Sequence, residues 1–126
     1  MKENERLRRG REKLQEVDAK AADQVMDSLA DVAPDIATYI EEFAFGDIYS
    51  RAGLSLQQRE MITVTSLLTQ GDTAAQLEVH INGCLNVGLT ENEVIETFIQ
   101  CLPYVGFPKV LNAVSVAKRV FAMREF

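Results

Sequence analysis

Apolar residues recur at intervals of three and four along almost the whole chain, and no segment shows the two-residue alternation of a half-buried strand. Two capping-box spacings occur just before such apolar stretches, Ser55 with Gln58 and Thr90 with Glu93. The sequence therefore predicts an all-α protein of about six helices.

Helix boundaries in the first half are indicated by Asp18, Pro34 and Gly46. Asp18 is suited to cap a helix at 19–30, and Pro34 is suited to begin a third helix that ends at Gly46. Residues 47–53 are then expected to form a turn. In the third helix, Ile36 and Phe43 are expected on the apolar side that faces the core. Before Asp18, residues 3–16 carry only a sparse apolar stripe, which predicts a helix on a surface that a neighbouring subunit could provide.

The second half has clearer signals for where helices start and end. The helix that starts at Ser55 should end at Gly71, and Asp72 or Thr73 should cap a helix that Gly88 closes. The helix opened by Thr90 is expected to stop or bend at Pro103, followed by a short connection at 104–107. A last helix from Pro108 has an apolar stripe broad enough to be buried on more than one side.

Length and composition exclude several classes of protein. A chain of 126 residues with 47% apolar and 25% charged residues is expected to form one domain, 1–126, of an ordinary globular protein. The net charge of −6 argues against a nucleic-acid partner. No apolar run is long enough for a membrane span and the N-terminus lacks a signal-peptide core, so we expect a cytoplasmic protein.

The cysteine pattern predicts free thiols. Cys84 and Cys101 are spaced neither as a metal knuckle nor as a CxxC redox pair. No metal site is expected, and Cys84 is interpreted as a small core residue.

Candidate site residues lie between positions 59 and 88. Gln76, His80 and Cys84 recur at steps of four and so share one helix face. His80 is the only histidine, the residue type whose unperturbed pKa lies near neutral pH, and so the natural candidate for moving a proton. Glu60 lies in an apolar stretch where a carboxylate needs a partner. We therefore expect Glu60, Gln76 and His80 to meet in one pocket.

Three segments together resemble the carboxymuconolactone decarboxylase family, which shares its all-helical fold with alkylhydroperoxidase D. They are FAFGDIYSRAGLSLQQREMITVTSLL, QLEVHINGCLNVGLTENEVIE and YVGFPKVLNAVSVAK. The resemblance covers nearly the whole chain. It implies a compact homo-oligomer, typically a hexamer built as a trimer of dimers, with sites near subunit contacts.

Departures from the family patterns bear on the chemistry. In the alkylhydroperoxidase branch a CxxC pair precedes the histidine, whereas this chain has Thr73 and Gln76 at the cysteine positions. Decarboxylases of the protocatechuate pathway commonly carry a tryptophan where this chain has Tyr49, and often a serine where it has Glu60. The sequence is more similar to the broader branch of the family than to its namesake enzyme.

The expected activity is that of a cofactor-free lyase acting on a small carboxylated lactone or related acid. Loss of a carboxylate beta to a carbonyl leaves an enolate, which needs a charge-stabilising donor and an acid that protonates carbon. His80 is the candidate acid and Glu60 the residue that orients or recharges it. The substrate would be bound by Gln76, Arg51, Arg59 and Tyr104, with an arginine holding its carboxylate.

Other interpretations remain open. Glu60 and His80 also suit proton abstraction or lactone hydrolysis, and Glu60 could instead form a structural pair with Arg51 or Arg59. Tyr104 and Phe107 could be pocket wall or core. The chain could be a catalytically inert helical oligomer that binds a ligand, whereas peroxide reduction through Cys84 alone is disfavoured without a resolving cysteine.

Apolar surface predicts self-association. The last helix is apolar around much of its circumference, and Leu7, Leu14 and Val17 form a stripe that one small core would hardly cover. Closed symmetry between identical subunits is the usual solution. We expect a hexamer in which the leading helix reaches across to a neighbour.

Overall fold

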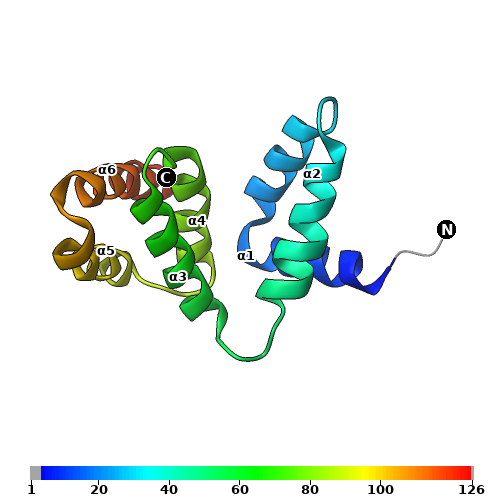
Figure 1. Cartoon of the computed structure of the whole chain (residues 1–126), viewed down its shortest axis with the longest axis horizontal. Helices are drawn as coiled ribbons and strands as arrows, with labels where there is room; N and C mark the ends of the chain where they lie inside the picture. The colour runs from blue at the N-terminus through cyan, green and yellow to red at the C-terminus, as the bar shows by residue number, and fades with distance from the viewer. Residues whose placement is uncertain (1–3, 126) are drawn as a thin grey trace. The chain divides into compact units, whose positions relative to one another are not determined.

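The structure is a computed structural model that describes residues 4–125, and it contains helices and no strand in that range. The all-α prediction is confirmed. The described residues form six α-helices, labelled in Figure 1, and one π-helical segment, η1. Their bounds are α1 Glu5–Leu29, α2 Pro34–Tyr39, η1 Ile40–Tyr49, α3 Leu56–Gln70, α4 Ala74–Asn86, α5 Glu91–Val105 and α6 Phe107–Arg124.

The chain forms two compact units, Met1–Leu56 and Gln57–Phe126. The first contains α1, α2 and η1, and the second contains nearly all of α3 together with α4, α5 and α6. The expectation of one domain over 1–126 stays a prediction.

Helix α1 is kinked at Asp18, where the backbone is extended (φ −163°, ψ 88°). The Asp18 carboxylate accepts a hydrogen bond from the Ala21 amide at 3.2 Å, so it caps the second half of α1 as predicted. Asn4 caps the first half by accepting from the Leu7 amide at 2.7 Å.

The apolar stripe of α1 is covered by the chain itself. Helix α1 packs against η1, and Leu14 and Val17 are buried. The expectation that this stripe needs the surface of a neighbouring subunit is therefore wrong for these two residues.

Gly10 and Gly46 let the backbones of α1 and η1 approach closely. A Cβ atom on Gly10 would overlap the carbonyl oxygen of Glu41, and one on Gly46 would overlap that of Arg6. The prediction that Gly46 ends a helix is wrong, because the helical path continues to Tyr49. Gly46 is needed because α1 and η1 cross closely at this position. In the sequence, a glycine with this role cannot be distinguished from a glycine that ends a helix.

Two predictions about residues 34–53 also fail. Pro34 begins a helix as expected, but the expected turn is helical as far as Tyr49. The i→i+5 spacing of a π-helix rotates side chains away from the positions of an α-helix. Consequently Phe43, expected to be a core residue, is exposed, whereas Phe45 is buried. Ile36, also expected in the core, lies in α2 before this segment and is exposed as well.

Charged pairs tie α1 to η1 around the glycine contact. The Arg6 guanidinium binds the Asp47 carboxylate at 2.8 Å, and Arg11 binds Glu41 at 3.0 Å. The hydrogen bond from Arg6 lowers the pKa of Asp47 below its usual value. These contacts are partly exposed, so they contribute orientation more than stability.

The second unit has a continuous apolar core built by α3, α4, α5 and α6. Its buried members are Val64, Leu68, Leu77, Ile81, Cys84, Leu89, Val94, Phe98, Cys101, Val110, Ala113, Val116, Ala117 and Val120. Five residues on one face of α6 are buried, but Leu111 is exposed, so the expected burial on more than one side is not seen in the single chain. None of the helices described between residues 4 and 125 is long and apolar enough to cross a membrane.

Helix ends in this unit mostly follow the sequence signals. Gly71 (φ 76°) ends α3, and Thr90 and Glu93 form the predicted capping box at distances of 3.0 and 2.9 Å. The predicted side-chain cap of α4 is absent. The Thr73 hydroxyl instead donates to the carbonyl of Leu67 at 2.6 Å.

The expected connection at 104–107 is shorter than predicted. Helix α5 continues through Pro103 to Val105. Gly106 (φ 96°) alone separates α5 from α6.

Substituting Gly10→Ala tests the close contact between α1 and η1. Alanine normally stabilises a helix relative to glycine by about 1 kcal/mol. Here the added methyl group overlaps the Glu41 carbonyl, so we expect destabilisation of about 1–3 kcal/mol in urea unfolding. Gly53→Ala is the matched control, since nothing lies within 4 Å of its Cβ position. A stabilised Gly10→Ala variant would contradict the contact.

Candidate active site

The turn between α3 and α4 brings Glu60 and His80 together. Gly71 and Asp72 both have positive φ (76° and 57°), which reverses the chain in a few residues. The Nδ1 atom of His80 lies 3.0 Å from one Glu60 carboxylate oxygen and 3.3 Å from the other. Glu60 and His80 are therefore in direct contact, whereas the expectation that they share one pocket with Gln76 stays a prediction.

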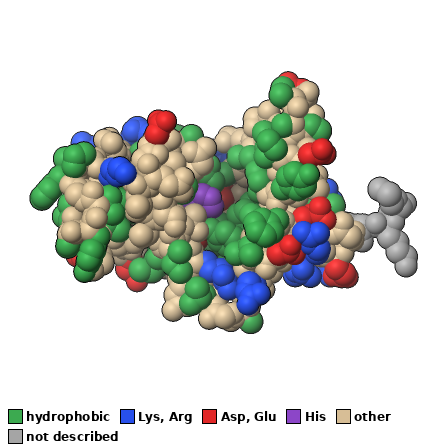
Figure 2. Space-filling view, in the orientation of Figure 1, with side chains coloured by type: hydrophobic (Ala, Val, Ile, Leu, Met, Phe, Trp, Pro, Cys, Tyr) green, Lys and Arg blue, Asp and Glu red, His purple; other side chains and the backbone are tan. Residues whose placement is uncertain are grey.

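Glu60 and His80 differ in exposure. Glu60 is completely buried, whereas 20% of the His80 side chain is exposed. Figure 2 shows the imidazole, coloured purple, at the molecular surface. Because an ionised carboxylate can only accept, Nδ1 carries the hydrogen whenever Glu60 is ionised. The contact therefore fixes the orientation of the ring.

Cys84 lies one turn beyond His80 on α4 and is fully buried. Burial, and secondarily the charge of Glu60, raises the pKa of this thiol to about 12. A thiol with that pKa is protonated at neutral pH and is a poor nucleophile. The interpretation of Cys84 as a core residue is confirmed, and Cys101 is likewise a buried free thiol.

The predicted substrate-binding residues Gln76, Arg59 and Arg51 lie in different segments of the chain. Gln76 lies on α4 one turn before His80, with an exposed side chain. Arg59 is half-buried beside Glu60 on α3, and Arg51 is exposed in the first unit after η1. Their binding roles stay predictions.

Tyr104 and Phe107 do not belong to the core. Tyr104 is 82% exposed near the end of α5, and Phe107 is 67% exposed at the start of α6. The core interpretation of these two aromatic residues is wrong. The binding role expected of Tyr104 stays a prediction.

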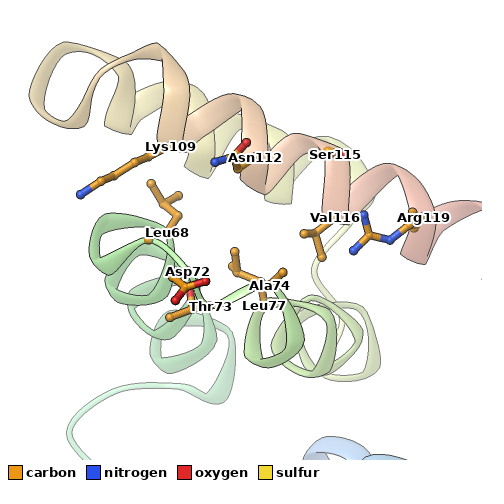
Figure 3. Close-up of a pocket in the computed structure, with 11 residues that line it drawn as sticks. Leu68, Asp72, Thr73, Ala74, Leu77, Lys109, Asn112, Ser115, Val116 and Arg119 are labelled. Atoms are coloured by element: carbon orange, nitrogen blue, oxygen red, sulfur yellow. The ribbon is translucent and has the colours of Figure 1, made fainter.

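A second polar group, on α6, was missed by the sequence reasoning. Its members line a cavity against the beginning of α4, and they are Lys109, Asn112, Ser115 and Arg119 (Figure 3). Their spacing of three, three and four residues places them on one face of the helix. That polar stripe on an otherwise apolar helix was the signal that could have identified them.

Acidic, histidine and cysteine side chains do not gather into a metal-binding group. Within residues 4–125 no three such residues come together in a way that could hold a metal ion.

Labelling of Cys84 by iodoacetamide tests its environment. At pH 8 the thiol should remain protonated, because its pKa is about 12, and labelling should be far slower in the native protein than in urea. Glu60→Gln removes the carboxylate that adds to the shift and should accelerate native labelling. Mass spectrometry of the peptides separates Cys84 from Cys101. Native labelling as fast as that in urea would contradict the buried, protonated thiol.

Comparison with known proteins identifies the family of the chain. Residues 34–119 match the model of the carboxymuconolactone decarboxylase family. The chain is 32% identical to a 4-carboxymuconolactone decarboxylase of Acinetobacter baylyi over 122 residues, 96% of this chain and 90% of that protein.

Two further relatives match a smaller share of the chain. An uncharacterized 15.0 kDa protein from the nqo9-nqo10 intergenic region of Paracoccus denitrificans is 30% identical over 77% of this chain and 73% of its own length. The nitrosuccinic acid decarboxylase of Metarhizium robertsii is 31% identical over 64% of this chain and 55% of its own length. The chain belongs to the carboxymuconolactone decarboxylase family.

Proposed function

We propose that this protein is a cofactor-free decarboxylase of a small carboxylic acid, either a carboxylated lactone or a related compound. The direct contact between a buried Glu60 and a partly exposed His80 carries this proposal. Two of the relatives are named as decarboxylases, one of 4-carboxymuconolactone and one of nitrosuccinic acid. Both named substrates are small carboxylic acids, which supports the reaction class.

His80 performs the proton transfer in this proposal. The bond between the substrate carbon and its carboxylate breaks, CO2 leaves, and the electron pair moves onto the neighbouring electron-withdrawing group. Protonated His80 then delivers a proton from Nε2 to that carbon. Glu60 stabilises the imidazolium before the transfer and holds the ring in position afterwards.

Arginine and amide side chains would bind the substrate. Arg59 is adjacent to Glu60 along α3, and its guanidinium suits a carboxylate through paired hydrogen bonds. Gln76, exposed on the helix that carries His80, would donate to the oxygen on which charge develops. Arg51 and Tyr104 are further candidates for substrate contacts.

We also propose that the chain assembles as a homo-oligomer, with a hexamer as the family resemblance implies. Several large apolar side chains of the second unit are exposed in the single chain, including Ile62, Tyr104, Phe107 and Leu111. Burial of such residues between subunits would remove apolar surface from water.

Replacing His80 and Glu60 tests the proposed chemistry. His80→Asn retains an N–H donor for Glu60 but cannot protonate carbon, so decarboxylation should fall by about 100-fold or more. Glu60→Gln should cause a smaller loss, because the imidazole remains. CO2 release from 4-carboxymuconolactone and from nitrosuccinic acid is the measurement.

Glu78→Gln, an exposed change on the same helix, is the matched control and should retain full activity. Circular dichroism must show the same helical content in all variants. Undiminished turnover by a folded His80→Asn variant would remove His80 from the mechanism. Wild-type protein that binds these acids without releasing CO2 would favour an inert ligand-binding oligomer.

Light scattering tests the assembly. The wild-type protein should have the mass of a hexamer at micromolar concentration. Leu111→Glu places a charge on an exposed apolar position of α6 and should shift the mass downward if that face is an interface. A wild-type monomer would contradict the proposed assembly.

A further inference from the structure

A cavity of about 310 Å³ lies in the second unit, where the beginning of α4 faces α6 and the end of α3. None of Glu60, Gln76 and His80 lines it, so it is separate from the candidate active site. Its volume is at the lower end of the range seen for small-molecule sites. Figure 3 shows the side chains that surround it.

The α6 wall of this cavity carries two cationic groups, Lys109 and Arg119. Lys109 donates one hydrogen bond to the carbonyl of Thr69 at 2.8 Å, which holds the ammonium at the cavity and leaves two further hydrogens. Neither cation forms a salt bridge with an acidic side chain within residues 4–125. The cavity lining therefore carries more positive than negative side chains, although the chain as a whole has a net charge of −6.

Neutral hydrogen-bonding groups and a helix end add to the attraction for an anion. Asn112 and Ser115 stand between the two cations along α6. The 13-residue helix α4 begins at the cavity, and no side chain caps its first amides. Those amides carry partial positive charge. Asp72 is the one acidic residue in the lining and opposes anion binding.

The floor of the cavity is apolar. Leu68, Leu77 and Val116 line it, and because they belong to the buried core each of them exposes little surface there. A ligand that fits both parts needs an anionic group and a short apolar body.

We propose that this cavity is a second binding site, which takes a small organic carboxylate with a short hydrocarbon chain. Its carboxylate binds Arg119, and its hydrocarbon chain lies along the apolar floor toward Lys109. This site does not depend on the proposed decarboxylase activity, because it uses different residues.

Calorimetric titration with adipate tests the site. Adipate has two carboxylates and a four-carbon chain, 1,6-hexanediol has a comparable chain without charge, and inorganic phosphate has charge without a chain. We expect adipate to bind more tightly than either comparison compound. The titrations use the His80→Asn variant, so that binding at the candidate active site does not obscure the result, and are repeated with wild-type protein.

Variants locate the bound anion. Arg119→Gln should weaken adipate binding about tenfold or more, the usual effect of losing a hydrogen bond to a charged group. Asp72→Asn should strengthen binding, because it removes the opposing carboxylate and asparagine tolerates the positive φ at this position. Lys118→Gln is the matched control, an exposed cation on α6 outside the lining, and should leave binding unchanged.

Adipate binding is expected to weaken in Arg119→Gln and to strengthen in Asp72→Asn. A folding defect would instead weaken binding in both variants, so the two causes can be distinguished. Equal losses in Lys118→Gln and Arg119→Gln would overturn the proposal, since they would indicate diffuse surface attraction. Absence of adipate binding, or phosphate binding as tight as that of adipate, would overturn it as well. If wild-type protein binds adipate and His80→Asn does not, the ligand occupies the active site and the proposal fails.

Discussion

A fully buried carboxylate is the constraint on which the second unit depends. Glu60 has no exposed surface and is surrounded by the apolar core of α3 to α6. An ionised carboxylate in such surroundings is costly unless it is paired, and removing one member of a buried pair typically costs about 3–5 kcal/mol. His80 provides the pairing from α4. The contact therefore joins two helices and at the same time orients the only histidine of the chain.

His80 and Cys84 differ in their access to solvent. Both lie on α4 one turn apart, yet the imidazole reaches the surface whereas the thiol is enclosed. Burial and the charge of Glu60 suppress ionisation of the thiol. The surroundings of Cys84 thus disfavour a thiolate and thiol chemistry at this site.

The first unit is organised by contact between backbones. Gly10 and Gly46 allow α1 and η1 to approach more closely than any side chain would permit, and the charged pairs between Arg6 and Asp47 and between Arg11 and Glu41 flank this contact. The π-helical segment supplies the rotation that buries Phe45 and Gly46. Here tertiary packing decides the local conformation.

The sequence by itself determined the features that short-range interactions control. Helical periodicity, the Thr90–Glu93 capping box and the Asp18 cap depend on neighbouring residues, and the Glu60–His80 contact follows from one tight turn and the need of a buried carboxylate for a partner. Only the tertiary structure decided the role of Gly46, the exposure of Tyr104 and the meeting of Lys109 with the start of α4. These features depend on which helix faces reach one another across long sequence separations, and the pattern along a single helix does not specify that register.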